Sequence, residues 1–241
     1  MEFTYESFSE RAKDSSLSKW EKIGFPDSYR RGLEESIFDD ISSKTRLSDA
    51  KLILDIGCGC SDLAENFISH AVDKDQSLYL VDSPEMLSSI DGDILNENIY
   101  RVPGRFPDSD VLGKLPIGSF DVIVVYSVIQ YVFINQSIYN FVHECIKLLK
   151  PGGRLLIGDV PNYQARERFL QSSEGQGFVR NENKVENTIN LEHENQERLD
   201  DSTIMSLLMR FRNFNCETYL LPQAKGLPFS NRREDILILK R

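Results

Sequence analysis

The stretch "KLILDIGCGCSDLAENF", residues 51–67, sets two cysteines and two glycines in alternation directly after an apolar run. The apolar run predicts a buried strand, and the residues after the glycines predict an amphipathic helix. If Cys58 and Cys60 are the functional pair, a Cys-x-Cys could hold a metal or form a redox couple. If Gly57 and Gly59 are, the tight turn lets the backbone approach a nucleotide-like ligand. The two interpretations predict different proteins.

The remainder of the chain alternates short apolar strands with amphipathic helices. Strands are predicted at 51–56, 77–82, 99–106, 120–127, 154–160, 216–222 and 235–241. Helices are predicted at about 61–71, after Pro84, and at 136–150, 163–172 and 200–213. Strands that are apolar on both faces and alternate with helices indicate a parallel sheet covered on both sides. The last two strands are too close for a crossover helix, so we expect them to pair antiparallel.

Composition limits the class of protein. The chain has 241 residues, is 40% hydrophobic and carries a formal net charge of -10. This acidic balance argues against nucleic acid or an anionic membrane as the main partner. Four cysteines are too sparse for a disulfide framework, and the start of the chain lacks the apolar core of a signal peptide. We therefore expect a cytoplasmic protein.

Two regions differ in character. Residues 1–50 form a polar, helix-prone segment with scattered aromatic side chains, either a lid over a ligand or a cover for the sheet. Residues 51–241 form the α/β domain, with a helical and polar insertion at about 161–214.

The glycine turn favours a particular kind of ligand. A dinucleotide fingerprint would need a third glycine at position 62, where the chain has Asp62, and a carboxylate there would repel a pyrophosphate. Gly57 and Gly59 therefore suit a nucleoside-like ligand without phosphates. Asp82 ends the second strand, where its carboxylate can accept hydrogen bonds from both ribose hydroxyls.

Four segments in this order resemble a known family: "LILDIGCGCSDLA", "LYLVDSPEML", "FDVIVVYSVIQYV" and "LKPGGRLLIGDV". They are similar to successive motifs of the class I S-adenosylmethionine-dependent methyltransferases of small-molecule type, over about residues 50–160. The resemblance implies a Rossmann-like, doubly wound α/β sheet of about seven strands, mostly parallel with an antiparallel last strand and helices on both faces. It also implies S-adenosyl-L-methionine as the cofactor.

The resemblance assigns roles to cofactor-binding residues. Asp55, Gly57 and Gly59 would line the methionine end, Asp82 would hold the ribose, Ser83 and Met86 would lie near the adenine, and Tyr126 would offer its backbone carbonyl to the ammonium. One departure concerns the segment after the third strand, where the family often has an acid for the adenine amino group. Here Gly104-Arg105-Phe106 stands in its place. We expect backbone groups and the Phe106 ring to contact the adenine instead.

Catalytic candidates follow from the chemistry of methyl transfer, which needs alignment, exclusion of water and, for a hydroxyl acceptor, a base. Gln130 and Tyr131 stand where related enzymes often carry histidine, and a glutamine cannot act as a base. Asp159, ending the fifth strand, is the acid best placed to reach the site. The alternative for Asp159 is that it caps the following helix together with Asn162.

The acceptor is less defined. Asn231, Arg232 and Arg233 follow the sixth strand and could bind an anionic acceptor, or could simply face solvent. The signature of base-methylating enzymes is absent after the fourth strand, where the chain reads "YSVI". A small-molecule hydroxyl is therefore favoured, such as that of a sugar or sugar nucleotide for a surface glycan.

Two other classes of protein stay open. One is a binding or regulatory protein that keeps the methyltransferase fold without catalysis. The other is a metal-thiolate protein, although Cys58 and Cys60 lack the further ligands that zinc needs. We expect no metal, and the sequence does not determine the oligomeric state.

Overall fold

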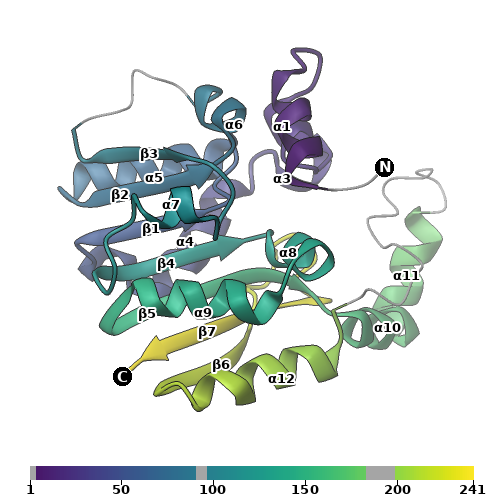
Figure 1. Cartoon of the computed structure of the whole chain (residues 1–241). Helices are drawn as coiled ribbons and strands as arrows, with labels where there is room; N and C mark the ends of the chain where they lie inside the picture. The colour runs from purple at the N-terminus through teal and green to yellow at the C-terminus, as the bar shows by residue number, and fades with distance from the viewer. Residues whose placement is uncertain (1–3, 91–96, 183–198) are drawn as a thin grey trace.

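The computed structural model describes residues 4–90, 97–182 and 199–241, which form a seven-stranded sheet with helices on both faces (Figure 1). The strand order is β3-β2-β1-β4-β5-β7-β6. The strands are β1 (Leu52–Ile56), β2 (Ser77–Asp82), β3 (Ile99–Pro103), β4 (Phe120–Tyr126), β5 (Leu149–Pro161), β6 (Cys216–Pro222) and β7 (Arg233–Lys240). The order reverses between β1 and β4, which is where open α/β sheets bind ligands.

Strand directions confirm the predicted fold class. The first five strands pair in parallel, and β7 lies antiparallel between β5 and β6. The largest difference from the predicted strand boundaries is in β5, which begins at Leu149 rather than at residue 154, and β3 ends at Pro103 rather than at residue 106. The preceding helix already ends at Leu148, so the Pro151-Gly152-Gly153 run that was predicted to end it lies inside β5 instead. Gly152 has a φ of 81°, and the pairing of β4 with β5 shifts register between Phe120 and Val122.

Helices occupy both faces and one edge of the sheet. The N-terminal helices are α1 (Tyr5–Lys13), α2 (Lys19–Lys22), α3 (Asp27–Arg30) and α4 (Glu34–Thr45), followed by a 3₁₀ turn at Leu47–Asp49. Those between the strands are α5 (Asp62–Asp73), α6 (Pro84–Ser88), α7 (Ser109–Leu112), α8 (Ile129–Asn135) and α9 (Ile138–Leu148). Between β5 and β6 lie α10 (Tyr163–Gln171), α11 (Ser173–Glu182) and α12 (Asp201–Arg212). Part of the predicted insertion, residues 183–198, lies outside the described residues.

The alternation of side chains along the strands builds two cores. In β4, Ile123 and Val125 belong to one core, whereas Val122 and Val124 belong to the other. The first core continues into α9 and α12, and the second into α4 and α5. Both faces of the central strands are therefore dry, which explains why their sequences are apolar throughout rather than alternating.

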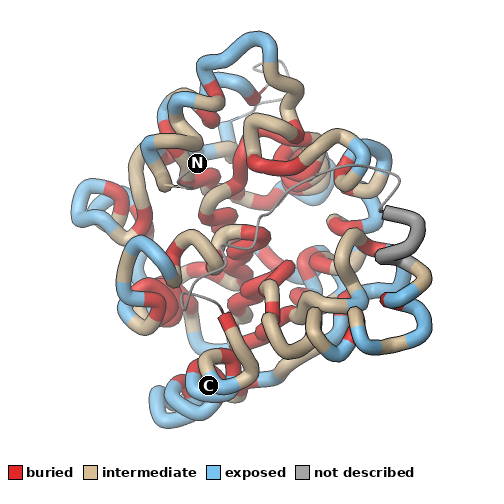
Figure 2. Tube along the Cα trace, turned by 90° about the vertical axis from the view of Figure 1, so that its right-hand side faces the viewer, coloured by how far each residue is buried: buried red, intermediate tan, exposed pale blue. Residues whose placement is uncertain are grey.

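The N-terminal helices α1 and α3 lie beyond the edge of the sheet at which the parallel strands end (Figure 1). Buried residues are concentrated in the central strands, and exposed ones lie mainly on outer helices and loops (Figure 2). Among the described residues, no helix combines the length and the apolar character needed to cross a bilayer.

A buried ion pair ties β7 to α4. Lys44 Nζ donates to Asp235 Oδ2 at 2.7 Å and to Asp40 Oδ2 at 2.5 Å. Asp235 is fully buried, and its Oδ1 accepts from the backbone N–H of Asp159 at 2.8 Å. Burial raises the pKa of Asp235, and the neighbouring Lys44 opposes that rise.

Asp235→Ala is expected to lower the free energy of unfolding by about 3 kcal/mol, because it leaves the Asp159 amide unpaired and removes one partner of a buried charge pair. Urea unfolding followed by circular dichroism measures the change. Asp39→Ala, an exposed acid on α4, serves as the control and should stay within about 0.5 kcal/mol of the wild type. Equal free energies of unfolding for the two variants would show that the Lys44–Asp235 ion pair does not stabilise the fold.

Candidate functional site

A cavity lies at the carboxyl ends of β1, β2 and β4, and the N-terminal segment forms one of its walls. Of the residues predicted for cofactor and catalysis, the cavity is lined by Asp55, Gly57, Gly59, Asp82, Met86, Arg105, Phe106, Tyr126 and Tyr131. The N-terminal segment contributes Tyr5, Phe8, Ile23, Phe25 and Arg30. The sheet therefore brings most of the predicted site residues together around one hollow.

The glycine turn is tightly constrained. Gly57 and Gly59 have φ values of 74° and 64°, in the left-handed region that favours glycine. A Cβ atom at Gly57 would lie 2.5 Å from Val128 Cγ2, and one at Gly59 would lie 2.6 Å from Ile23 Cγ2. Both positions therefore need glycine on two counts, namely backbone conformation and the close approach of neighbouring side chains.

Asp82 closes the turn from the neighbouring strand. Its Oδ2 accepts from the Gly59 N–H at 2.8 Å, and its Oδ1 accepts from the Ser83 N–H at 2.7 Å. Burial raises the pKa of Asp82 to about 6, with these two backbone hydrogen bonds opposing the rise. Each carboxylate oxygen can accept a further hydrogen bond, so the group can still receive two hydroxyls from the cavity.

Asp55 adds a second acid to this end of the cavity. It is 3% exposed, and burial together with the charge of Asp82 raises its pKa to about 8. Within the described residues, neither Asp55 nor Asp82 forms an ion pair. A ligand that brings positive charge to this end would therefore meet carboxyl groups that no side chain of the described protein neutralises.

The far end of the cavity is apolar and aromatic. Phe106 is buried and stacks edge-on against Phe141 with the ring centroids 5.0 Å apart. Met86 is buried and also lines the cavity, whereas Arg105 is half-buried. Ser83 has a different place, because its hydroxyl accepts from the Met86 N–H at 3.2 Å and caps α6.

Residues that follow β4 occupy the middle of the cavity. Tyr131 packs edge-on against Phe8 of the N-terminal segment with the ring centroids 4.9 Å apart, and burial raises its pKa. Gln130 Nε2 donates to the backbone carbonyl of Ser127 at 2.8 Å, which fixes the start of α8. Tyr126 is buried, and burial followed by the charge of Asp159 raises the pKa of its hydroxyl well above the usual range.

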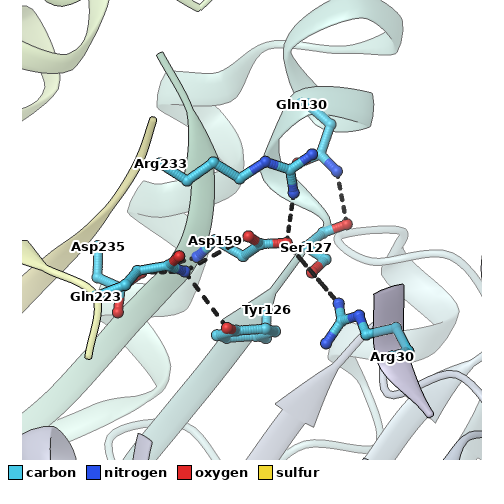
Figure 3. Close-up of polar contacts among 8 residues, drawn as sticks. All are labelled: Arg30, Tyr126, Ser127, Gln130, Asp159, Gln223, Arg233 and Asp235. Atoms are coloured by element: carbon cyan, nitrogen blue, oxygen red, sulfur yellow. Dashed lines mark hydrogen bonds and ion pairs between the residues drawn. The ribbon is translucent and has the colours of Figure 1, made fainter. Parts of the chain in front are cut away.

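Asp159 lies behind the cavity wall rather than on it. Its Oδ2 accepts from Ser127 Oγ at 2.5 Å and from Arg233 Nη1 at 2.6 Å (Figure 3). Ser127 lines the cavity and also accepts a hydrogen bond from Arg30 Nη2 at 2.6 Å. A role for Asp159 toward a ligand would therefore pass through Ser127. The predicted alternative, a helix cap, belongs to Asn162, whose Oδ1 accepts from the Ala165 N–H at 3.2 Å.

The predicted acceptor-binding loop lies apart from the cavity lining. Arg233 holds the buried Asp159 carboxylate. Arg232 lies against aromatic rings, with its guanidinium 4.6 Å from the Phe229 centroid and 5.5 Å from that of Phe169. Asn231 is exposed and accepts from Arg232 at 3.1 Å. Binding of an acceptor by these three residues stays a prediction.

Sequence reasoning missed the part that the N-terminal segment plays in the glycine turn. Glu34 Oε2 accepts from the Leu63 N–H at 2.8 Å, so its carboxylate occupies the start of α5. Lys19 forms an ion pair with Asp62 at the same place. Protein carboxylates therefore occupy the start of α5, which is the position where a dinucleotide-binding enzyme would bind phosphate. The mixture of aromatic and charged residues in "KWEKIGFPDSYRRG", residues 19–32, indicated a possible lid but did not indicate these particular contacts.

The two cysteines of the turn are buried and unpaired. Burial raises the pKa of the Cys58 thiol, and it raises that of Cys60 to about 11, so both stay protonated near neutral pH. The described residues contain no group of three or more side chains arranged to hold a metal.

Comparison with known proteins identifies the central region. Residues 54–155 match the family model described as "Methyltransferase domain" (Methyltransf_12), and this match confirms the resemblance seen in the sequence. The comparison with curated protein sequences finds no match.

Solved structures share the fold at low sequence identity. The plantazolicin methyltransferase BamL, in complex with a triazolic desmethylPZN analog and SAH, is 15% identical with a TM-score of 0.60, covering 98% of this chain and 97% of its own. A putative O-methyltransferase from Klebsiella pneumoniae is 14% identical with a TM-score of 0.55, covering 100% of this chain and 91% of its own. The CurJ carbon methyltransferase is 12% identical with a TM-score of 0.57, covering 98% and 66% respectively. At these identities the likeness shows the fold alone.

The raised pKa values of Asp55 and Asp82 predict a stability that depends on pH. Both groups bind protons more tightly in the folded state than in the unfolded chain, so the stability they contribute is complete below about pH 4 and is lost as the pH rises toward 8. The free energy of unfolding of the ligand-free protein should therefore fall by up to about 1.4 kcal/mol per pH unit and per group in this window.

Asp55→Asn removes the larger of the two contributions and is expected to make the ligand-free protein more stable than the wild type at pH 8. Urea unfolding at pH 5, 6.5 and 8 measures the effect, and Asp39→Asn, an exposed acid, is the control. A wild-type stability that does not fall between pH 5 and pH 8 relative to Asp55→Asn would contradict the prediction.

Proposed function

We propose that this chain is an S-adenosylmethionine-dependent methyltransferase that acts on a small molecule. The observation that carries the proposal is a pair of acids that flank the glycine turn and line the cavity, the buried Asp55 and the half-buried Asp82. Neither acid has an ion-pair partner among the described residues. S-adenosylmethionine combines a ribose with two cationic groups, and these are the groups that such a site would bind.

The residues present fit the cofactor. Asp82 Oδ1 and Oδ2 each have room to accept a ribose hydroxyl in addition to their backbone donors. Asp55 would compensate positive charge at the methionine end, and the flat apolar surface of Phe106 and Met86 suits an adenine ring. When bound, the cofactor supplies a methyl group on a positively charged sulfur, which makes it reactive toward a nucleophile in line with the bond.

The N-terminal segment would exclude water from this reaction. Tyr5, Phe8, Ile23 and Phe25 line the cavity opposite the strand ends, and Phe8 is fixed there by its contact with Tyr131. An apolar wall of this kind favours the transfer by removing water from around the reacting groups. In this proposal residues 1–50 act as a lid, and residues 51–241 supply the methyltransferase domain.

The residues after β4 would align the acceptor, for which we propose a hydroxyl. Ser127 Oγ lines the cavity and donates its own proton to Asp159, so its remaining lone pair is open to a hydroxyl of the acceptor. The acceptor hydroxyl would lose its proton to Ser127 Oγ as the methyl group is transferred, while Ser127 passes its own proton to Asp159, so Asp159 would act through Ser127 rather than in contact with the acceptor. Tyr131 would contact the acceptor directly, and Gln130 would hold the Ser127 carbonyl in place.

Sugars and sugar nucleotides are the hydroxyl acceptors that we propose to test. The alternative is a protein that binds the cofactor and does not transfer methyl. Radiolabelled S-adenosylmethionine, incubated with the protein and a panel of hydroxyl, amine and carbon-acid acceptors, separates these possibilities. Transfer to hydroxyl acceptors supports the proposal, transfer only to amines or carbon acids overturns the choice of atom, and binding without any transfer favours the alternative.

Asp82→Ala is expected to weaken binding of S-adenosylmethionine and S-adenosylhomocysteine by roughly 1.5–3 kcal/mol, the range for hydrogen bonds to a charged group. The substitution also removes the acceptor of the Gly59 N–H and so loosens the turn. Isothermal titration calorimetry of each variant with each ligand measures the change.

Cys60→Ser is the matched control, since it changes a buried residue of the same turn that does not line the cavity. Its dissociation constant should stay close to that of the wild type. An unchanged affinity in Asp82→Ala would show that the ribose is held elsewhere, and no binding of either ligand to the wild type would overturn the proposed function.

Binding of the cofactor should also release protons. A cation beside Asp55 and hydroxyls on Asp82 both favour the ionised carboxylates, so affinity should rise as the pH increases from 5 to 8 through the raised pKa values of about 6 and about 8. Calorimetry in buffers of different ionisation enthalpy measures the number of protons released. In Asp55→Asn the rise above pH 6.5 should disappear. An affinity that falls over this range would be inconsistent with the proposed roles.

A further inference from the structure

Arg30 is a buried cation that lines the cavity. It ends α3 of the N-terminal segment, and only 3% of its surface is exposed. Its guanidinium lies 4.3 Å from the Phe25 ring centroid and 5.4 Å from that of Tyr126. These two rings hold the planar group in one orientation, which is the arrangement that protein sites use to present a guanidinium to a ligand.

The hydrogen-bonding capacity of this guanidinium is largely unused. An arginine carries five N–H donors. Within the described part of the chain, the hydrogen bond recorded for Arg30 is the one from Nη2 to Ser127 Oγ, at 2.6 Å. The nearest carboxylate oxygen, Asp159 Oδ2, lies 3.8 Å away, which is too far for a hydrogen bond. A buried guanidinium with unmet donors is costly unless an anion or several acceptors complete its shell.

The carboxylate nearest to Arg30 is already engaged by another cation. Arg233 donates to the same Asp159 oxygen at 2.6 Å, and it approaches from the opposite side to Arg30 (Figure 3). The next acid, Asp235, is paired with Lys44 at 2.7 Å. Burial raises the pKa of Glu34 and the nearby charge of Arg30 opposes that rise, but the Oε2 atom of Glu34 is held by the Leu63 N–H. The local acids thus leave the donors of Arg30 that face the cavity without a partner.

The strand order separates the partners of Arg30 from the acids at the cofactor end of the cavity. Asp55 and Asp82 end β1 and β2, whereas the partners of Arg30 end β4 and β5. The strand order places β4 and β5 on the other side of β1 from β2. A ligand that fills the acidic half would therefore leave the half next to Arg30 for a second molecule.

We propose that Arg30 binds an anionic group of the methyl acceptor, a carboxylate or a phosphate, and so selects acidic small molecules as substrates. This inference rests on the proposed function in that the second molecule is the acceptor. Aromatic stacking orients the guanidinium, and Ser127 holds one of its nitrogens. The remaining donors form the paired hydrogen bonds that a carboxylate or phosphate accepts. A cofactor carboxylate is the other source of the same chemistry, and the experiment distinguishes the two.

The test uses the 241-residue chain and four variants of it. Arg30→Gln removes the charge, and Arg30→Lys keeps the charge while losing the planar fork. Arg31→Gln is the control, since Arg31 is the next residue and is exposed. Circular dichroism and thermal unfolding establish that each variant is folded, and Ser127→Ala provides a milder disturbance of the same contact if Arg30→Gln does not fold. Each protein is titrated with S-adenosylhomocysteine, and the saturated complex is then titrated with inorganic phosphate and with acetate at constant ionic strength.

The expected result is that the wild type and Arg31→Gln, saturated with S-adenosylhomocysteine, bind phosphate or acetate. Arg30→Gln should lose roughly tenfold or more in affinity for that anion, and Arg30→Lys should fall between the two. Affinity for S-adenosylhomocysteine should change by less than about twofold in Arg30→Gln, because in this proposal Arg30 binds the anionic group of the acceptor and not the carboxylate of the cofactor.

Three results would overturn the proposal. Equal anion affinity in the wild type and Arg30→Gln, or no anion binding to the saturated wild type, would show that Arg30 is only structural. A tenfold loss of S-adenosylhomocysteine affinity in Arg30→Gln, with competition between that ligand and phosphate in the wild type, would assign Arg30 to the cofactor. Failure of the wild type to bind S-adenosylhomocysteine would instead overturn the proposed function, and anion binding to the ligand-free protein would then still report on Arg30.

Discussion

The buried carboxylate of Asp159 is the contact on which the arrangement of the site depends. One of its oxygens accepts hydrogen bonds from Ser127 after β4 and from Arg233 on β7, and Ser127 in turn binds Arg30 of the N-terminal segment. Asp159 and Ser127 both have φ values near 60°, at 58° and 59°, a conformation that costs free energy in residues other than glycine. The interlocked hydrogen bonds offset that cost and fix the wall of the cavity at the ends of three strands and one helix.

The charges around the cavity follow the strand order. Acids without ion-pair partners end β1 and β2, and the guanidinium of Arg30 lies at the ends of β4 and β5. The two halves meet at the point where the strand order reverses, and residues of the N-terminal segment line the cavity. The cavity therefore offers unpaired acids to a cationic ligand at one end and, at the other, a guanidinium whose donors are only partly satisfied. This polarity is consistent with a reaction between two molecules of opposite local charge.

The fold class could be predicted from the sequence because the strands and main helices of the sheet are indicated by patterns of neighbouring residues. The apolar runs, the glycine turn and the acid at the end of β2 depend on residues close together in the chain, and the structure has β1, β2 and β4 where they were predicted. The start of β5 was misplaced because a helix-ending Pro-Gly-Gly run also permits a bulge inside a strand, and local residues do not distinguish these outcomes. Contacts between distant segments had no local signal. Glu34 accepts a hydrogen bond from Leu63 at the start of α5, and the two residues are 29 positions apart in the chain. Nothing in the residues around either position predicts this hydrogen bond.

The same limit applies to the basic residues, because their individual surroundings could not be predicted from the sequence. Arginines at positions 30, 31, 232 and 233 look alike in an acidic chain, and proximity to a strand end was the property that could be read from spacing. What separates them is the number of donors that the folded protein satisfies. Arg233 forms an ion pair with Asp159, Arg232 lies against aromatic rings, and Arg31 is exposed. Arg30 is buried, it donates one hydrogen bond among the described residues, and its nearest carboxylate oxygen lies 3.8 Å away, so an anion in the cavity would satisfy donors that the described protein leaves open.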